Sequence, residues 1–502
     1  MLIYFPFYYI ICKNEFYLHR NFFFENLINY VYLGGIYLNI FNNIVLSLNN
    51  FLWSYVLIVL LLTLGIYFTF KSKFVQFRYF KEMIRLLGAP SPSNKEKKQV
   101  SSFQAFCIST ASRVGTGNIA GIAIAITLGG PGSVFWMWLV ALIGGASSFV
   151  ESTLAQIYKV KDKEGFRGGP AYYIAKGLNS KFLSIAFSIL ITISFGFVFN
   201  AIQSNTVTEA FRAAFGVDKI VIGVILAILT TLVIFGGVHR VAKISEVIVP
   251  VFAVAYILVS LFVIAINIDK LPDIFKLIIE NAFGLKAIAG GGIGTTILMG
   301  VKRGLFSNEA GMGSAPNAAA AATTSHPVKQ GLVQALGVFT DTIVICSCTA
   351  LIILCSDYSS ANLAGIQLTQ YALSSQIGVI GNYFIAICTF LFAFSSIVGN
   401  YYYGQSNIEF ISTNKTILTS YRVLVIAMVI FGSLTAVDIV WNLGDLFMGF
   451  MAIINLYAIA RLSKFAFLAL KDYTNQKKSG TKEPIFKASS IDGLSGTECW
   501  ED

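Results

Sequence analysis

A short polar stretch interrupts a long apolar segment of this sequence. Arg113, Gly115, Gly117 and Asn118 lie within six positions, inside an apolar run from about 103 to 128. The run is long enough to cross a bilayer, and an unbroken lipid-facing helix has no use for such residues. A helix that breaks near the midplane does, because its freed backbone N–H groups can hold an anion and its carbonyls a cation. The stretch predicts a broken helix at a binding site.

The composition places that helix in a polytopic, all-α membrane protein. The chain has 502 residues, of which 56% are hydrophobic and 12% charged, whereas soluble domains carry about 25% charged residues. Many windows of about 20 residues lack charge, and the alternating ten-residue strands of a porin-type barrel are absent. The net charge of +11 comes from short loops between apolar segments. That pattern indicates membrane orientation and not nucleic-acid binding.

Metal and enzyme chemistry find little support in the sequence. Most of the seven cysteines lie inside apolar segments, no C-x-x-C pair occurs, and the three histidines are far apart. These spacings do not suit a metal site or a disulfide framework. No acid, base or metal cluster typical of an enzyme is evident, and no nucleotide-binding loop is present. We therefore expect no enzyme activity and no organic cofactor.

The order of apolar and basic segments predicts about eleven transmembrane helices. Basic residues gather at 71–98, at 159–181, near Arg240, at Lys415 and beyond Arg461. One alternation places all of these in the cytoplasm, with the N-terminus outside and the C-terminus inside. The loop at 267–288 then lies outside and contains a short surface helix at 273–283. The expected spans are 51–70, 103–128, 133–158, 182–211, 219–236, 244–266, 289–322, 328–355, 380–411, 418–436 and 438–460.

Three regions follow from these spans. Residues 1–45 form a peripheral N-terminal extension, which could reflect a misassigned start. Residues 46–471 form the transmembrane domain. Residues 472–502 form a polar cytoplasmic tail that we expect to be disordered.

The polar stretch recurs in the second half of the chain. The spacing Arg113-x4-Asn118-x-Ala-Gly returns at Arg303-x4-Asn308-x-Ala-Gly, an offset of 303 − 113 = 190. A phenylalanine-rich pattern that starts at Phe195 returns at Phe390 with an offset of 390 − 195 = 195. Partners lie five spans apart, so the halves run in opposite directions. The prediction is a 5+5 inverted repeat, about 100–267 and 286–465, preceded by one extra helix.

Each repeat should then begin with a broken helix. We place the first break at 115–117 and the second at 304–308, with the glycine run at 290–294 as a rival. Several of these features also have a simpler structural explanation. Glycines can serve helix packing, and Ser395 and Ser396 can bond back to their own helix. The buried acids could neutralise Arg113 and Arg303 or carry protons. These acids are Glu151, Glu246, Glu309 and Asp341.

Four motifs resemble the alanine or glycine:cation symporter family, of the amino acid–polyamine–organocation superfamily. They are STASRVGTGNIAG (109–121), FRGGP (166–170), RGLFSNEAGMGSAP (303–316) and GNYYYG (399–404). The resemblance covers about 41–500 and implies a leucine-transporter-type fold, in agreement with the inverted repeat. It implies Na+-coupled symport of small neutral amino acids, alanine or glycine, into a prokaryotic cell across its plasma (inner) membrane, by a monomer working through alternating access. Proton coupling, or a serine-type permease of the same fold, is the alternative.

The resemblance also implies roles for individual residues. The backbone amides of Thr116 and Gly117 would hold the substrate carboxylate, supported by Asn118. Gln203 would face the ammonium group, and Phe199 would wall the methyl pocket. Phe306 and Asn400 would close the cavity, although some relatives carry tryptophan at the position of Asn400. The Na+ ligands would be the carbonyls of Ala111, Val114 and Phe392 and the hydroxyls of Ser395 and Ser396.

Overall fold

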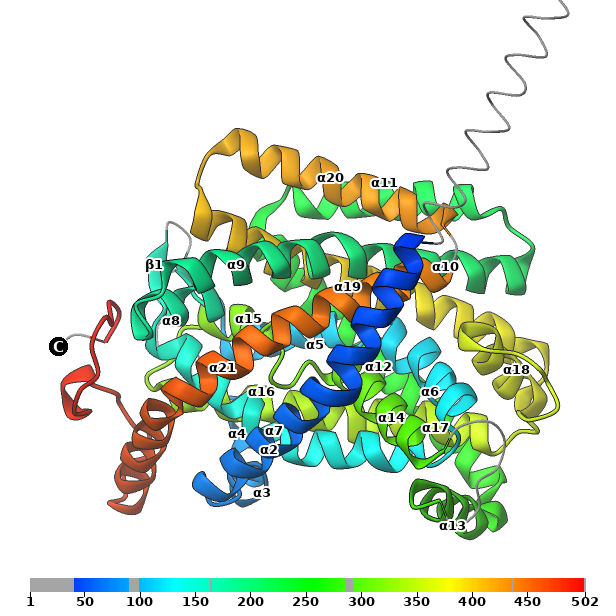
Figure 1. Ribbon diagram of the computed structural model, residues 1–502, viewed down its shortest axis with the longest axis horizontal. Coiled ribbons are helices and arrows are strands. Elements are labelled where there is room, and N and C mark those ends of the chain that lie inside the picture. Colours follow the sequence, from blue (N-terminus) through cyan, green and yellow to red (C-terminus); the bar gives the residue numbers. More distant parts are fainter. Residues whose placement is uncertain (1–39, 90–98, 163–164, 285–291, 436, 501–502) are drawn as a thin grey trace, which may run out of the picture.

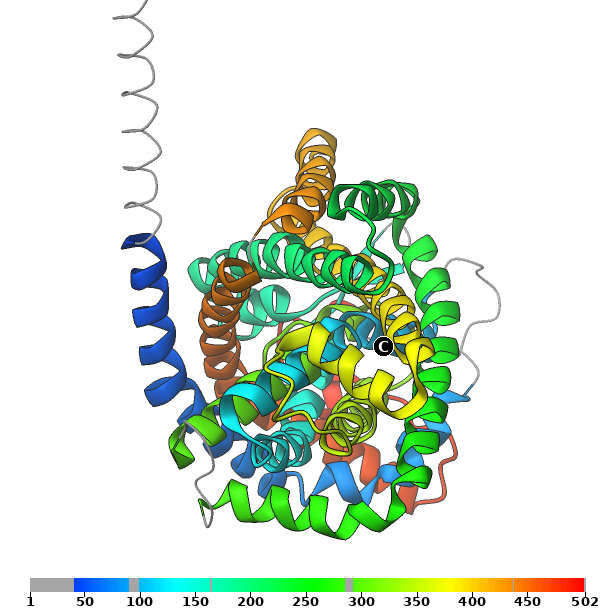
Figure 2. The ribbon, with the colours of Figure 1, turned by 90° about the vertical axis from the view of Figure 1, so that its right-hand side faces the viewer.

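Helices make up nearly all of the regular structure, because apolar segments in lipid must satisfy their backbone groups internally. The computed structural model describes residues 40–89, 99–162, 165–284, 292–435 and 437–500. Figure 1 shows α5 near the middle of the bundle, with α11 and α20 along one edge. The two edge helices pack against each other, and they remain together in the perpendicular view of Figure 2.

The first half of the chain contains the first broken helix and a small hairpin. Its elements are η1 (Leu52–Leu57), α2 (Ile58–Lys71), α3 (Val75–Arg78), α4 (Phe80–Leu87), α5 (Ser102–Arg113), η2 (Gly117–Gly121), α6 (Ile122–Gly129), α7 (Ser133–Ile157), β1 (Val160–Asp162), β2 (Gly165–Arg167), α8 (Pro170–Gly177), α9 (Lys181–Ile191), η3 (Thr192–Phe199), α10 (Asn200–Phe215), α11 (Lys219–Ile234), α12 (Gly237–Ile266), η4 (Ile268–Lys270) and α13 (Leu271–Ala282).

The second half contains the second broken helix and the longest helix. Its elements are α14 (Ile293–Asn308), α15 (Ala315–Ala321), α16 (Pro327–Val338), η5 (Phe339–Cys346), α17 (Ser347–Leu354), α18 (Gly365–Ile377), α19 (Val379–Ile411), α20 (Lys415–Leu434), α21 (Val437–Lys478) and η6 (Ala488–Ser490). Strands β1 and β2 form the antiparallel hairpin that precedes α8.

The interior and the periphery differ as expected for a membrane bundle. Helix α7 packs along α14 and α16, and most of its residues are buried. The peripheral helix α12 instead exposes large apolar side chains, among them Val247, Val251 and Leu258. An apolar surface of this kind suits lipid contact and not water.

The predicted spans coincide with helices. Among the described residues, eight helices are long and apolar enough to cross a membrane, and a bent pair, 102–113 with 117–129, adds a ninth. The two other predicted spans correspond to the shorter helix α11 and to α14 with α15. The surface helix expected at 273–283 is confirmed as α13. Within the predicted N-terminal extension, residues 1–39 lie outside the described residues, and a helix covers Ile40–Lys71.

The expectation of a disordered tail is wrong for residues 472–500. Helix α21 continues to Lys478, and the chain beyond it returns to the bundle. The Trp500 indole N–H donates to the Gln156 carbonyl at 2.8 Å, and the Phe486 N–H donates to the Ser325 carbonyl at 2.9 Å. Three apolar side chains that are sparse in the tail sequence, Phe486, Ile491 and Trp500, are buried. A few such anchors order a segment whose average composition is polar.

His326 lies next to the tail, and its burial determines its protonation state. Burial lowers the pKa of His326, just before α16, so its imidazole is neutral at pH 7. Its Nδ1 accepts from the Val328 N–H at 3.2 Å, which leaves Nε2–H to donate to Asp472 at 3.1 Å. His326 therefore connects the start of α16 to α21, beside the tail.

Replacing Trp500 with alanine should release the tail. Losing this buried ring and its hydrogen bond should cost about 2 kcal/mol of local stability, which corresponds to roughly thirtyfold faster cleavage of an opened segment. Limited trypsin digestion of the detergent-solubilised protein measures the rate. Ile485→Ala is the control, because Ile485 is 62% exposed. Equal cleavage rates for both variants would contradict the anchoring role of Trp500.

Candidate functional site

The first predicted break is confirmed. Helix α5 begins at a capping box formed by Ser101 and Gln104 and ends at Arg113. Val114 leaves the helical region with a ψ of 86°, and helical structure resumes from Thr116 into η2. The two halves are bent by 51°.

The glycines at this break permit close approach of three other helices. A Cβ on Gly115 would collide with the Ser396 hydroxyl of α19 and lie 2.9 Å from Gln203 Oε1 of α10. A Cβ on Gly117 would lie 2.9 Å from the Phe306 ring of α14. These glycines therefore place the loop in direct contact with the side chains predicted to surround the substrate.

The second break lies a few residues beyond its predicted position, so the prediction of 304–308 is wrong. Helix α14 continues through Gly304 to Asn308, and Gly304 packs against Met137 of α7 instead. The chain departs from the helix at Glu309, whose φ is +57°, and helix α15 starts at Ala315. Gly311 and Gly313, with φ of +81° and +87°, supply the left-handed conformations needed there. Of the rival run at 290–294, residues 290 and 291 lie outside the described residues.

A buried carboxylate satisfies the amides of the second break. Glu151 of α7 accepts from the N–H groups of Gly311 and Gly313 at 3.2 and 3.1 Å, and from Asn455 at 2.8 Å. Glu309 in the break accepts from Ser112 of α5 at 2.6 Å. The two breaks are thus joined by a hydrogen bond inside the bundle.

The two arginines of the repeat have different partners. Arg303 forms an ion pair with Asp445 at 2.8 Å, and Lys302 joins the same carboxylate at 2.7 Å. The sequence left open whether one of the four buried acids neutralises Arg303, and the ion-pair partner is instead Asp445 of α21. Arg113 donates to the Gln334 carbonyl at 3.2 Å and lies 3.4 Å from the Ser148 hydroxyl. Of the four acids, Glu246 is only half-buried.

The predicted carboxylate cradle is assembled around side-chain amides. The Thr116 N–H donates to Gln203 Oε1 at 3.0 Å, and the Gly115 N–H donates to Asn118 Oδ1 at 3.0 Å. Both acceptors are neutral, so a carboxylate could replace them with a gain in electrostatic attraction. Gln203 and Asn118 therefore both lie beside the backbone amides of the break.

Aromatic rings close one side of this cradle. Phe306 packs against Phe199 with ring centroids 4.8 Å apart and against Trp441 at 4.9 Å. Trp441 was not predicted, because one aromatic residue in an apolar helix carries no distinguishing signal. The polar contacts of Asn400 are with other polar side chains and not with these rings. Its side-chain oxygen lies 2.7 Å from the Ser112 hydroxyl, and its Nδ2 donates to Asn200 at 3.2 Å.

The predicted cation ligands come from the end of α5 and from α19, and the two serines of α19 have different partners. The Ser396 hydroxyl donates to the Ala111 carbonyl at 2.8 Å and lies 3.3 Å from the Val114 carbonyl. Ser395 donates to the Phe392 carbonyl of its own helix at 2.8 Å. The back-bonding alternative therefore describes Ser395, whereas Ser396 reaches across to α5. The C-terminal carbonyls of a helix lack internal partners and carry partial negative charge, so these oxygens suit a monovalent cation.

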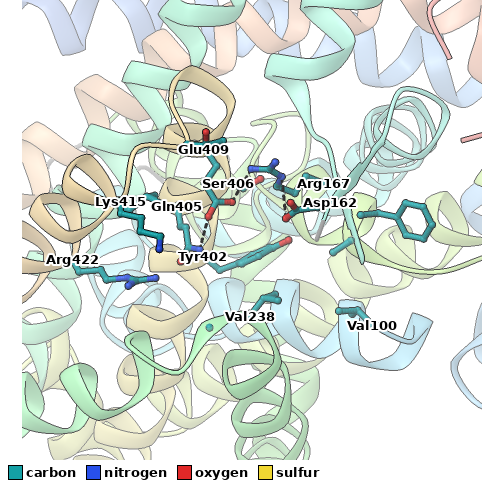
Figure 3. Close-up of a pocket in the computed structure, with 15 residues that line it drawn as sticks. Val100, Asp162, Arg167, Val238, Tyr402, Gln405, Ser406, Glu409, Lys415 and Arg422 are labelled. Atoms are coloured by element: carbon teal, nitrogen blue, oxygen red, sulfur yellow. Dashed lines mark hydrogen bonds and ion pairs between the residues drawn. The ribbon is translucent and has the colours of Figure 1, made fainter. Parts of the chain in front are cut away.

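Two cavities flank the breaks at opposite ends of the bundle. The tail-side cavity, of about 410 Å³, is lined by the start of α5, the hairpin and the end of α19 (Figure 3). The far-side cavity, of about 470 Å³, is lined by α6, α10, the start of α18 and the pair Arg303 and Trp441. Among the described residues, no group of three or more His, Cys, Asp or Glu side chains could hold a metal ion.

Comparison with known proteins identifies the family. The model of the sodium:alanine symporter family matches residues 38–488. The chain belongs to the sodium:alanine symporter family. It is therefore a multi-pass membrane transporter and not an enzyme, and Na+ is its co-transported ion.

Individual relatives agree with this assignment. The chain is 58% identical to the probable sodium/glutamine symporter GlnT of Bacillus subtilis, covering 92% of this chain and 96% of the relative. It is 37% identical to the sodium/alanine symporter AgcS of Methanococcus maripaludis, covering 88% and 99%. A mutant of the Eremococcus coleocola manganese transporter shares the fold, with a TM-score of 0.50, 14% identity and coverage of 79% and 84%.

Replacing Ser396 with alanine should weaken the binding of Na+ to this symporter. Loss of one hydroxyl near the Ala111 and Val114 carbonyls should raise the Na+ concentration for half-maximal uptake about tenfold. Transport assays over a range of Na+ concentrations measure this. Ser374→Ala serves as the control, because that hydroxyl bonds within α18. Unchanged Na+ dependence in Ser396→Ala would remove this cation site.

Gly117→Ala should weaken substrate binding while Gly121→Ala does not. A Cβ at 117 would overlap the Phe306 ring, whereas one at 121 would meet its nearest neighbour, the Trp441 ring, at an ordinary 3.8 Å. Overpacking typically costs about 1–3 kcal/mol, so affinity should fall roughly tenfold to a hundredfold. Equilibrium binding to purified protein tests the pair. Equal affinities would argue against a substrate held at Gly117.

Proposed function

We propose that this protein takes up small neutral amino acids, with alanine or glycine as substrate, by Na+-coupled symport and alternating access. The observation that carries the proposal is the break after α5. Its amides face Gln203 and Asn118 on one side, and its carbonyls meet Ser396 on the other. One loop therefore contributes to an anion site and to a cation site.

Substrate binding follows from an exchange of acceptors. The substrate carboxylate takes the Thr116 and Gly117 amides, and Gln203 gives up the bond that it makes with Thr116. Gln203 Oε1 is then free to accept from the substrate ammonium group. The same side chain thus occupies the cradle before binding and contacts the other end of the amino acid afterwards.

Pocket size favours small side chains. Phe199, Phe306 and Trp441 stand in contact beside Gly117, and large aromatic rings exclude bulky substrates sterically. A second candidate substrate is glutamine. It is suggested by the 58% identical relative named as a probable glutamine symporter and by the neighbouring amide pair Asn200 and Asn400.

The two cavities and the hairpin between α15 and α19 support alternating access in this proposal. In Figure 3, Arg167 lies between Asp162 and Glu409, with 3.1 Å to each carboxylate. Glu409 stands on α19, the helix that also carries Ser396. The glycines after Arg167 pack against α15, since a Cβ on Gly168 would lie 2.6 Å from Ala320. The hairpin thus fastens α15 to α19 beside the tail-side cavity, and its release would open that end.

The tail side faces the cytoplasm in this proposal. Basic loops and the C-terminus share that end of the bundle, as the positive-inside rule requires. Na+ and the amino acid enter through the far-side cavity and leave through the tail-side cavity. The protein works as a monomer in this proposal.

Uptake of radiolabelled alanine into proteoliposomes tests the function. An inward Na+ gradient should drive accumulation, and collapsing it with an ionophore should abolish accumulation. Unlabelled glycine, serine and glutamine are added as competitors to define the substrate. Uptake that ignores Na+ but follows a proton gradient would overturn the proposed coupling.

A further inference from the structure

A groove between the tail-side ends of α2 and α21 has no role in the proposed transport cycle. Its volume is about 640 Å³, against about 410 and 470 Å³ for the two cavities that flank the breaks. Figure 1 shows the two helices side by side, running to the same end of the bundle. We call this cavity the basic groove, because its lining includes Lys71, Lys73, Arg78, Lys464, Lys471 and Lys478.

The charges of the basic groove are uncompensated. No aspartate or glutamate lines it, and among the described residues none of its six cations forms an ion pair. Nearby carboxylates have other partners. Glu82 of α4 pairs with Arg85 and Lys477, and Asp472 of α21 pairs with His326. Six like charges around one cavity repel one another, and an anion bound there lowers that cost.

Helix α21 presents its three lysines on one face. Lys464, Lys471 and Lys478 are seven residues apart, which is close to two helical turns, so they lie in one row along the helix. Leu468 lies in the same row and also lines the groove. The row therefore follows the groove over about 20 Å, since a helix rises 1.5 Å per residue.

A tight turn brings the other three cations to the groove. Helix α2 ends at Lys71, and the next residues include Lys73 and Phe74 with φ of +56° and +57°. Left-handed conformations at two successive non-glycine residues are costly, so the surrounding structure must hold the turn in place. Arg78 folds back across it, and its Nη2 donates to the Ser72 carbonyl at 3.2 Å. The turn thus directs three cations of one short segment toward α21.

An aromatic wall closes the groove toward the middle of the bundle. The rings of Tyr67 on α2 and Phe467 on α21 meet edge to face, with centroids 6.3 Å apart. Tyr67 is 42% exposed, and exposed tyrosines of membrane proteins gather at the depth of the lipid headgroups. Farther from the tail, α2 exposes Val59 and Ile66. Cations on one side and an apolar surface on the other match the two parts of a phospholipid.

We propose that the basic groove binds an anionic phospholipid of the cytoplasmic leaflet. The phosphate lies among Lys71, Lys464 and Lys471, and the acyl chains run past Tyr67 along the lipid-facing side of α2. Basic pockets between transmembrane helices hold anionic lipid headgroups on the cytoplasmic side. The positive-inside rule accounts for basic residues on this side, but it requires neither a shared cavity nor an aromatic wall. The site depends on neither the transported amino acid nor the coupling ion.

Native mass spectrometry of the purified protein in a neutral detergent, with dioctanoyl phosphatidylglycerol added, tests this site. The wild type should bind this lipid more tightly than phosphatidylcholine of the same chain length, which has no net charge. Replacing Lys464 and Lys471 together with glutamine should lower the affinity roughly thirtyfold, from the usual contribution of two cations near an anionic lipid. Replacing both with arginine should preserve it. The matched control replaces Lys181 and Lys243, two exposed lysines outside the groove, with glutamine and should bind like the wild type.

Three results would overturn the lipid site. The first is equal affinity of the wild type for the two lipids. The second is an equal loss of affinity in the two glutamine double variants, which would show that only the total charge of the protein matters. The third is displacement of the lipid by an equal concentration of glycerol phosphate, which would show a site for a free phosphate that makes no use of the aromatic wall. Because the assay contains neither an amino acid nor a Na+ gradient, an error in the proposed function leaves its outcome unchanged.

Discussion

The architecture depends on how backbone groups freed inside a membrane are satisfied. A helix that breaks in the bundle exposes N–H and C=O groups that lipid cannot bond. At the first break these groups meet Asn118, Gln203 and Ser396. At the second, Glu151 receives two N–H groups. Both breaks therefore depend on polar side chains from helices distant in sequence, Gln203 and Ser396 at the first and Glu151 at the second.

The two breaks are satisfied by different chemistry, and this difference assigns their roles. The second carries the Glu151 side chain from α7, so its amides have a fixed protein acceptor in the absence of substrate. The first has only neutral acceptors, which a ligand carboxylate can displace. A pair of related half-helices thus provides one fixed structural element and one exchangeable binding site. This asymmetry supports the proposal that the substrate binds at the first break.

Much of this arrangement could be predicted from the sequence, but only where one segment carries the whole signal. Glycine beside arginine and asparagine in an apolar run correctly located the first break. The second break was misplaced because Gly304 and Gly311 look equivalent in sequence, and only packing against Met137 shows that Gly304 belongs to a continuous helix. Asp445 as the partner of Arg303, and Trp441 as a wall beside Phe306, depend on how α21 crosses α14. The ordered tail depends likewise on a distant surface that accepts Trp500.

Helix α19 connects the first break with the β1–β2 hairpin. Ser396 contacts the carbonyls of the first break, and Glu409, on the same helix, contacts Arg167 of the hairpin that packs on α15. An ion that holds Ser396 against α5 also restrains the position of Glu409, because the intervening helix is continuous. Binding free energy at the break can therefore bias the hairpin contact, and by linkage the hairpin contact biases ion affinity equally. In the proposed function, ion binding is coupled to access from the tail side through α19, which carries Ser396 at the first break and Glu409 at the hairpin.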